Sequence, residues 1–250
     1  MDSLLIAAPA TVVAAGGLIG YASAHPASEI FGRSIRRTTT AKKLAITFDD
    51  GPNPAITPKL LDLFARHNAH ATFFLIGDFV KQFPELVRET VRHGHALGNH
   101  TDTHPNLFKR TPSQIKNHLQ RADDAITEAA GISPKWFRPP YGLRNPWVIP
   151  AANRLNMQAV MWTLIAGDWK ARSKEWLIPR MAPIAKHAEK NIGKHAKVPG
   201  DILCLHDGNH AQQNGDRHCT LEALEYWLPR WRDLGLEFVT IDEAVRTPAT

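Results

Sequence analysis

The sequence lacks the features of a disulfide scaffold or a repeat protein. Its 250 residues include two cysteines, Cys204 and Cys219, too few to hold a fold together by cross-links. We expect two buried thiols, although export would allow them to pair. No internal repeat or low-complexity tract is visible. With 43% hydrophobic and 22% charged residues, the chain can bury a core as one globular domain.

Acidic residues are outnumbered by basic ones. The chain has 30 Lys and Arg against 24 Asp and Glu, a net charge of +6. This excess favours an acidic partner such as nucleic acid, anionic lipid or an anionic cell-wall polymer. No zinc finger and no aromatic-basic RNA-binding strand is present, so we expect no nucleic-acid partner. We expect a monomer.

One long apolar run occupies residues 4–23. About 20 apolar residues can span a bilayer, but Met1-Asp2-Ser3 supplies no basic residue of the kind that begins a signal peptide. Ala22-Ser23-Ala24 could serve as a cleavage site, whereas the basic residues after it argue against placing the downstream domain outside. We predict membrane anchoring or export to the cell envelope; a packed apolar helix in a cytoplasmic protein is the alternative.

Residues 1–41 form this apolar segment and a linker, and residues 42–250 form the folded domain. Short β-branched and aromatic runs predict seven strands, at residues 44–48, 71–76, 95–98, 135–137, 157–163, 201–205 and 238–241. Amphipathic helices are expected between them, one starting at a Thr111–Gln114 capping box. Alternating strands and helices predict an α/β fold with a parallel sheet closed into a barrel.

The stretch of residues 174–197 is strongly basic. We expect it to be helical in part and broken at Pro179 and Pro183, because proline lacks the N–H that a helix interior needs. It could contact an anionic polymer or a lipid surface, or be a solvated helix face. Its basic residues are Lys186, His187, Lys190, Lys194, His195 and Lys197.

Polar residues follow the predicted strands, and the carboxyl ends of parallel barrel strands form the active-site face. His100 and His104 have the spacing of metal ligands and would face the same way on one helical turn. With one carboxylate they would make a site for catalytic zinc or octahedral iron. No Glu lies between them, so a base must come from elsewhere, and Asp49 or Asp50 is available. A capped loop is the alternative for the histidines alone.

Five ordered motifs together resemble the polysaccharide deacetylases, the NodB-like domains of carbohydrate esterase family 4. The resemblance covers roughly residues 43–245 and implies a distorted (β/α)₇ barrel. It departs from the family pattern at Ile165, where many relatives carry a further acidic residue. The motifs are Thr47-Phe-Asp-Asp-Gly-Pro52, His100-Thr-Asp-Thr-His104, Arg138-Pro-Pro-Tyr-Gly142, Asp168-Trp169 and Leu205-His206-Asp207.

The resemblance implies a metal site made by Asp50, His100 and His104. The metal would usually be zinc, with Co²⁺, Ni²⁺ or Mn²⁺ as alternatives. Asp49 would be the general base that takes a proton from the attacking water. Arg138 would orient Asp49 and keep it ionised.

The resemblance also implies the remaining roles. The backbone N–H of Tyr141 would help to hold the oxyanion. His206 would protonate the leaving amine, and Asp168 would favour its imidazolium form. Trp169 and Leu205 would line the pocket for the acetyl group and the sugar, to which Tyr141 would contribute.

The family's activity predicts a metal-dependent hydrolase that removes N-acetyl groups from glycans containing N-acetylglucosamine, such as peptidoglycan or a chitin-like oligomer. An O-acetyl esterase on xylan, or an amide hydrolase on a small molecule or lipid-linked sugar, would use the same residues. A non-catalytic glycan-binding relative would have lost one of the site residues. A membrane-surface adaptor would depend only on the apolar segment and the basic charge.

Overall fold

The computed structural model describes residues 16–194 and 198–246. Residues 4–15 of the predicted apolar run, and His195 and Lys197 of the basic stretch, lie outside this range. No helix in the described ranges is long and apolar enough to cross a membrane.

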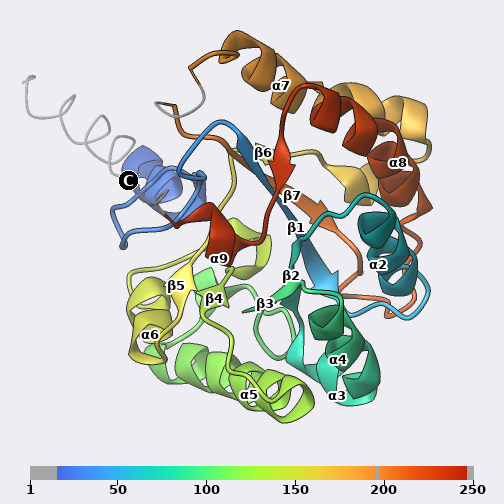
Figure 1. Cartoon of the computed structure of the whole chain (residues 1–250). Coiled ribbons are helices and arrows are strands. Elements are labelled where there is room, and N and C mark those ends of the chain that lie inside the picture. The colour runs from blue at the N-terminus through green and yellow to red at the C-terminus, as the bar shows by residue number, and fades with distance from the viewer. Residues whose placement is uncertain (1–15, 195–197, 247–250) are drawn as a thin grey trace, which may run out of the picture.

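A single parallel sheet forms the centre of the molecule (Figure 1). Its strand order is β5-β4-β3-β2-β1-β7-β6, and β8 pairs with the start of β1. The path is open between β5 and β6, so the curled sheet is an incomplete barrel and the predicted distorted (β/α)₇ barrel is confirmed. The strands are β1 (Lys43–Gly51), β2 (Thr72–Leu75), β3 (Ala96–Asn99), β4 (Trp136–Phe137), β5 (Gln158–Ala159), β6 (Leu164–Ile165), β7 (Asp201–His206) and β8 (Glu237–Phe238).

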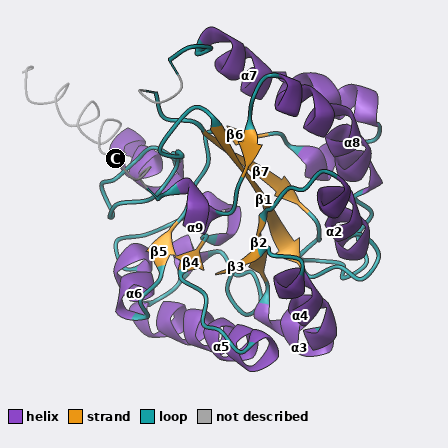
Figure 2. Ribbon diagram, viewed as in Figure 1, coloured by secondary structure: helices purple, strands orange, loops and turns teal. Residues whose placement is uncertain are grey.

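The helices surround this sheet (Figure 2). Their apolar faces pack on the strands, and Phe48 of β1 stacks on Phe73 of β2 at 5.0 Å between ring centroids. The predicted capping box of Thr111 and Gln114 is present at the start of α5. The helices are α2 (Thr57–Arg66), α3 (Gly77–Gln82), α4 (Pro84–Arg92), α5 (Pro112–Ala130), α6 (Val148–Arg154), α7 (Lys174–Lys190), α8 (His218–Asp233) and α9 (Ile241–Ala244).

The predicted break at Pro179 and Pro183 is wrong, because α7 continues through both prolines. Both lie on the exposed side of the helix, where water can bond the carbonyls that lose their N–H partners. The opposite face buries Leu177, Met181 and Ile184 against the core. Packing of an amphipathic face therefore outweighs the low helix propensity of proline.

Two of the predicted strands differ in the structure. The strand expected at residues 157–163 is shorter, since only β5 (Gln158–Ala159) and the bridge residue Val160 fall within it, and β6 follows it at the other edge of the sheet. The strand expected at residues 238–241 ends at Phe238, because Thr240 caps α9 with a capping box to Glu243.

The segment predicted as a linker packs on the domain. Ile35 forms a parallel bridge with Val160 at the open edge of the barrel, and Ser28 and Thr38 are buried. At the other end of this segment, Thr39 donates its N–H to Ala244 O of α9 at 2.9 Å. In Figure 1 the blue N-terminal segment accordingly lies beside the red α9.

Candidate active site

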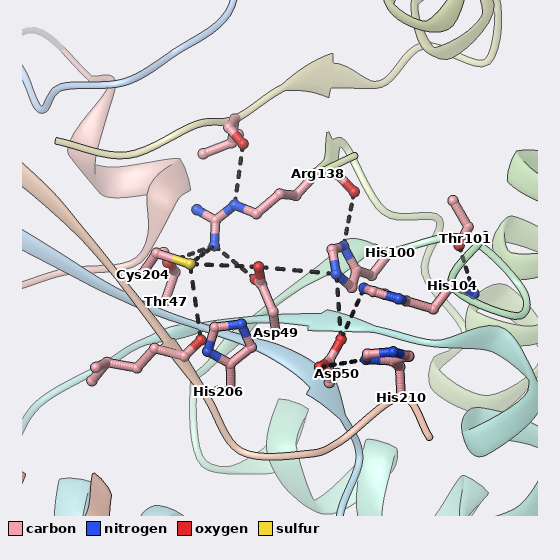
Figure 3. A network of polar contacts seen from close by, with 12 residues as sticks. Thr47, Asp49, Asp50, His100, Thr101, His104, Arg138, Cys204, His206 and His210 are labelled. Carbon is pink, nitrogen blue, oxygen red and sulfur yellow. Dashed lines mark hydrogen bonds and ion pairs between the residues drawn. The ribbon is translucent and has the colours of Figure 1, made fainter. Parts of the chain in front are cut away.

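Two adjacent carboxylates lie at the carboxyl end of β1. In a regular strand the side chains of Asp49 and Asp50 would point to opposite faces. The register of β1 against β2 shifts between Asp49 and Gly51, and Asp50 has φ of +71°. This bulge-like irregularity lets both carboxylates approach His100 Nε2, at 3.9 Å from Asp49 and 3.5 Å from Asp50 (Figure 3).

Asp49 is paired with a fully buried arginine. Arg138 Nη1 donates to Asp49 Oδ1 at 2.7 Å and to Thr47 Oγ1 at 2.8 Å. Arg138 Nε donates to the carbonyl of Val160 at 3.1 Å, and its guanidinium lies over the ring of Phe74. These contacts fix the guanidinium beside the Asp49 carboxylate as its ion-pair partner.

Asp50, His100 and His104 converge in a way that fits a metal ion. Their ligand atoms all lie within 4.8 Å of one another, and all three residues are buried. Asp50 Oδ1 lies 3.2 Å from His104 Nε2 but has no hydrogen-bond partner. Burial lowers the pKa of His104 to about 3, so the imidazole is neutral at pH 7 and can bind a metal. The unbonded carboxylate oxygen of Asp50 and the two imidazoles together form the ligand set of a His₂-carboxylate metal site.

The two histidines lie on a loop, so the expectation that they share a helical turn is wrong. Thr101 and His104 have φ of +69° and +56°, and Thr101 Oγ1 accepts the His104 N–H at 3.1 Å. His100 is oriented separately, through a 2.8 Å contact from Nδ1 to Arg138 O. This contact to the backbone fixes the ring and leaves Nε2 free for a metal.

His206, at the end of β7, is held by Asp168. His206 Nδ1 lies 2.8 Å from Asp168 Oδ1, and its backbone N–H donates to Oδ2 at 2.8 Å. Thr220 Oγ1 also donates to Oδ2, at 2.9 Å. Burial would lower the pKa of His206, but the charge and hydrogen bond of Asp168 raise it to about 9. His206 is therefore an imidazolium at pH 7.

Tyr141 and Trp169 line a cavity of about 340 Å³ above these groups. Tyr141 has φ of +59° and is half-exposed. A Cβ on the next residue, Gly142, would come within 2.7 Å of the Trp162 side chain, so this turn requires glycine. The cavity also exposes Asp50, His100, His104 and His206.

Leu205 does not line this cavity in the described structure. It is fully buried in the core cluster and pairs with Phe48 on β1. Successive residues of a strand point to opposite faces. Since Cys204 and His206 point toward the site (Figure 3), Leu205 between them points into the core.

Two further side chains, which the sequence motifs do not predict, belong to this network. His210, on the loop after β7, stacks on His104 at 4.2 Å between ring centroids, and its Nδ1 lies 3.6 Å from Asp50 Oδ2. Cys204 Sγ lies 3.5 Å from Asp49 Oδ2. The alternation of β7, with Cys204 two residues before His206, could have revealed the cysteine. No spacing rule points to His210. Both cysteines are free, with Cys204 buried and Cys219 partly buried.

Comparison with known proteins identifies consistent relatives. Residues 36–160 match the family model "Polysaccharide deacetylase". A peptidoglycan-N-acetylglucosamine deacetylase of Bacillus cereus is 36% identical over 211 residues, covering 82% of this chain and 89% of that protein. A chitooligosaccharide deacetylase of Azorhizobium caulinodans is 33% identical over 207 residues, covering 80% and 93%.

Solved structures give the same picture of the fold. A peptidoglycan N-acetylglucosamine deacetylase bound to a hydroxamate-type benzamide aligns with a TM-score of 0.71 at 30% identity, covering 86% of this chain and 92% of that one. A family 4 pseudoenzyme from Bacillus anthracis aligns with a TM-score of 0.72 at 26% identity, covering 86% and 69%. Similarity of fold thus extends to an inactive protein, and the side chains of the site must decide whether chemistry is retained.

Proposed function

Because this chain belongs to the polysaccharide deacetylase family, we propose that it hydrolyses the N-acetyl groups of glycans that contain N-acetylglucosamine. The observation that carries this proposal is that a metal-ligand set and an imidazolium acid line one cavity, with a buried carboxylate base beside them. A non-catalytic relative would lack one of these groups, and this chain has all of them.

Asp50, His100 and His104 would hold a divalent metal ion, which we propose to be zinc. Such an ion lowers the pKa of a bound water toward ~7 and polarises the carbonyl group of the amide. Three protein ligands leave positions open for water and substrate, as catalytic zinc sites require.

Asp49 is the proposed general base. The ion pair with Arg138 stabilises the carboxylate that must accept the proton of the attacking water. Asp49 lies beside the metal ligands, so it can take this proton without moving. A positioned base typically contributes about 10²–10⁴-fold to the rate.

His206 is the proposed general acid for the leaving amine. Its Nδ1 faces Asp168, so Nε2 carries the proton that can be delivered. Base and acid come from neighbouring strands, β1 and β7. One proton can therefore leave the water while another reaches the nitrogen.

The backbone N–H of Tyr141 is proposed to bind the oxyanion, and the half-exposed rings of Tyr141 and Trp169 to hold the sugar. Their place on the cavity wall supports both roles. Aromatic rings bury apolar area and can stack on the C–H face of a sugar ring. The rings of Tyr141 and Trp169 would thus hold the sugar at the edge of the cavity that receives its N-acetyl group.

We propose a location at the cell envelope, where such glycans are found. The exposed Leu18 and Ile19 on the N-terminal helical residues 16–24, next to basic residues in the following segment, support contact with a membrane surface. Fractionation with carbonate or salt washing would distinguish a peripheral contact from an integral anchor.

The function is tested by acetate release from chitin oligomers and peptidoglycan, with metal analysis of each protein. Asp49→Asn should keep its metal and lose about 10²–10⁴-fold in kcat. His104→Ala should lose metal and activity together. Asp62→Asn, an exposed change on α2, and His67→Ala, after the carboxyl end of α2 and so at the opposite end of the barrel, are the controls.

The result distinguishes three cases. Metal binding with no acetate release from any glycan would reject the substrate class and direct attention to acetylated xylan and small amides. Failure of the wild type to bind metal would reject the mechanism. Loss of metal in Asp49→Asn would contradict the division of roles between the two carboxylates.

A further inference from the structure

One basic side chain on the cavity wall has donor capacity that the described protein does not use. Arg217, directly before α8, lines the cavity beside His206 and Trp169. Its Nε is buried without a hydrogen-bond partner among the described residues. Its Nη1 donates only to a backbone carbonyl, that of Asp216, at 3.0 Å. An unsatisfied buried N–H on a charged group is costly, unless a ligand completes it.

The carboxylate nearest in sequence is already engaged elsewhere. Asp216 is exposed and accepts from the backbone N–H of His218 at 2.8 Å, with its Oδ1 2.6 Å from His218 Nδ1. The Asp216 carboxylate therefore does not pair with the Arg217 guanidinium.

The rest of the cavity wall adds little negative charge. Among its described lining residues Asp50 is the only carboxylate, and it is committed to the metal-ligand set. Ile165, on the same wall, is uncharged. The charge of the His206 imidazolium is matched by Asp168, whereas Arg217 has no carboxylate partner among the described residues. An unpaired cation on a cavity wall attracts a ligand of the opposite charge.

We propose that Arg217 binds a carboxylate on the sugar next to the one that is deacetylated, so that the preferred substrate is an anionic N-acetylglucosaminyl glycan. This inference rests on the proposed function and narrows its substrate class. The lactyl ether carboxylate of N-acetylmuramic acid, which alternates with N-acetylglucosamine in peptidoglycan, is a group of this class where the stem peptide has been removed from it. A neutral chitin-type oligomer offers none.

The position of Arg217 suits this role. It lies one helical turn before Thr220, which holds Asp168, the partner of His206. The guanidinium is thus on the same side of the cavity as the proposed acid. A guanidinium fork matches a carboxylate with two parallel hydrogen bonds, whereas a lysine acts as a point charge.

The test compares three tetrasaccharides of equal length. One is the β-1,4-linked N-acetylglucosamine tetramer. The other two alternate N-acetylglucosamine with N-acetylmuramic acid, without peptide, with the lactyl carboxylates either free or converted to primary amides. In the wild type, kcat/KM for the acid should exceed that for its amide by roughly 10- to 100-fold, the effect of a charge-assisted hydrogen-bond pair. This ratio should shrink as ionic strength rises.

Arg217→Gln should bring the acid-to-amide ratio close to one, and Arg217→Lys should keep part of it. Arg230→Gln is the matched control. It removes the same charge from the far end of α8, where Arg230 stacks on Tyr226, and it should keep the wild-type ratio. A wild type without preference, or a preference that survives in Arg217→Gln, would overturn the proposal.

Binding separates this proposal from the proposed function. The acid and the amide are titrated by calorimetry into metal-loaded Asp49→Asn, with and without Arg217→Gln. If no acetate were released from any glycan, the proposed function would fail, yet the ratio of the two affinities would still decide the role of Arg217. Equal affinities in the Asp49→Asn protein would refute it.

Discussion

At the scale of single residues, the site divides labour between two carboxylates that adjoin in sequence. Asp49 is paired with the Arg138 guanidinium, whereas Asp50 faces the imidazoles of His100 and His104. These different partners support the proposed roles, with Asp49 as the base and Asp50 as a metal ligand.

Asp168→Asn should shift the alkaline limb of the pH–rate profile. The pKa of His206 is raised to about 9 chiefly by Asp168 acting against burial, so the acid remains protonated until the pH passes that value. Without the carboxylate, activity should fall at lower pH, by about one or more pH units. Profiles of kcat/KM between pH 6 and 10 would measure this; an unmoved alkaline limb would exclude His206 as the acid.

The same pKa shift has a consequence for stability. Since the folded pKa lies above the unfolded value of 6.5, the His206–Asp168 pair stabilises the fold fully below about pH 6.5. This contribution is lost as the pH rises through about 9. Denaturant titrations at pH 6 and 9.5 should show a smaller pH dependence in Asp168→Asn than in the wild type.

Arg138→Met should be strongly destabilising. Arg138 is fully buried, and its removal leaves the Asp49 carboxylate buried without a counter-ion, a loss of about 3–5 kcal/mol in the free energy of unfolding. Adding Asp49→Asn should restore much of that loss, because no charge is then buried. Urea unfolding of the metal-free proteins at pH 7 would measure both; equal stability of the single and double variants would assign the loss to packing.

At the scale of elements, the loop of residues 100–104, which carries the proposed metal ligands His100 and His104, is held against α5 by side-chain contacts. Asp102 is buried, accepts from Arg121 Nε at 2.6 Å and pairs with His118 Nδ1. Its carbonyl also accepts the N–H of Asp78 on α3 at 2.9 Å. The loop backbone at Thr101 and His104 is left-handed, so these contacts hold a conformation that the loop would not keep alone.

Asp102→Asn should therefore weaken metal binding without removing a ligand. We expect the Kd for Zn²⁺ to rise about 10- to 100-fold, the usual effect of losing a group that orients the ligands. Competition with a chromophoric chelator would measure it. Asp124→Asn, an exposed change on α5, should leave the Kd for Zn²⁺ unchanged. An unaltered Kd in Asp102→Asn would mean that the loop holds its shape through Thr101 and the backbone.

The same loop shows what the sequence could and could not predict. The order of strands and the residues after each strand follow from local patterns, so the meeting of Asp50, His100 and His104 at one rim was predictable. The conformation of the loop was not, because it depends on contacts with α3 and α5, distant in sequence. The position of His210 beside His104 could not be predicted for the same reason, because it depends on the conformation of the loop after β7. In α7, tertiary packing overrode the signal of two prolines.

At the scale of the whole molecule, the N-terminal segment is part of the active-site scaffold. Arg144 is buried, and its Nη2 donates to the carbonyls of His25 and Ser28 at 2.6 and 3.1 Å. Its Nη1 donates to Gly142 O at 3.2 Å, in the turn that carries Tyr141. The segment before β1 therefore contacts the turn of the proposed oxyanion site through Arg144, whose backbone N–H also donates to Ser23 O at 3.0 Å.

Removing residues 1–28 should lower both stability and activity. The truncation leaves the buried Arg144 guanidinium without two of its acceptors, a loss of at least about 3 kcal/mol, or roughly 6–12 °C in Tm for a chain of this size. Arg144 would no longer be held in place to donate to Gly142 O in the turn that carries Tyr141, so kcat/KM should also fall. Thermal unfolding and acetate release would measure the two effects.

Two further proteins identify the cause. Removing residues 1–15 retains each of these Arg144 contacts, so the difference between the two truncations measures what residues 16–28 contribute. Adding Arg144→Met to the 1–28 truncation should recover part of the lost stability, since no unpaired charge is then buried. If the 1–28 truncation had the Tm and kcat/KM of the wild type, the N-terminal segment would not contribute to the active site. The exposed Leu18 and Ile19 would then act only in the proposed membrane contact.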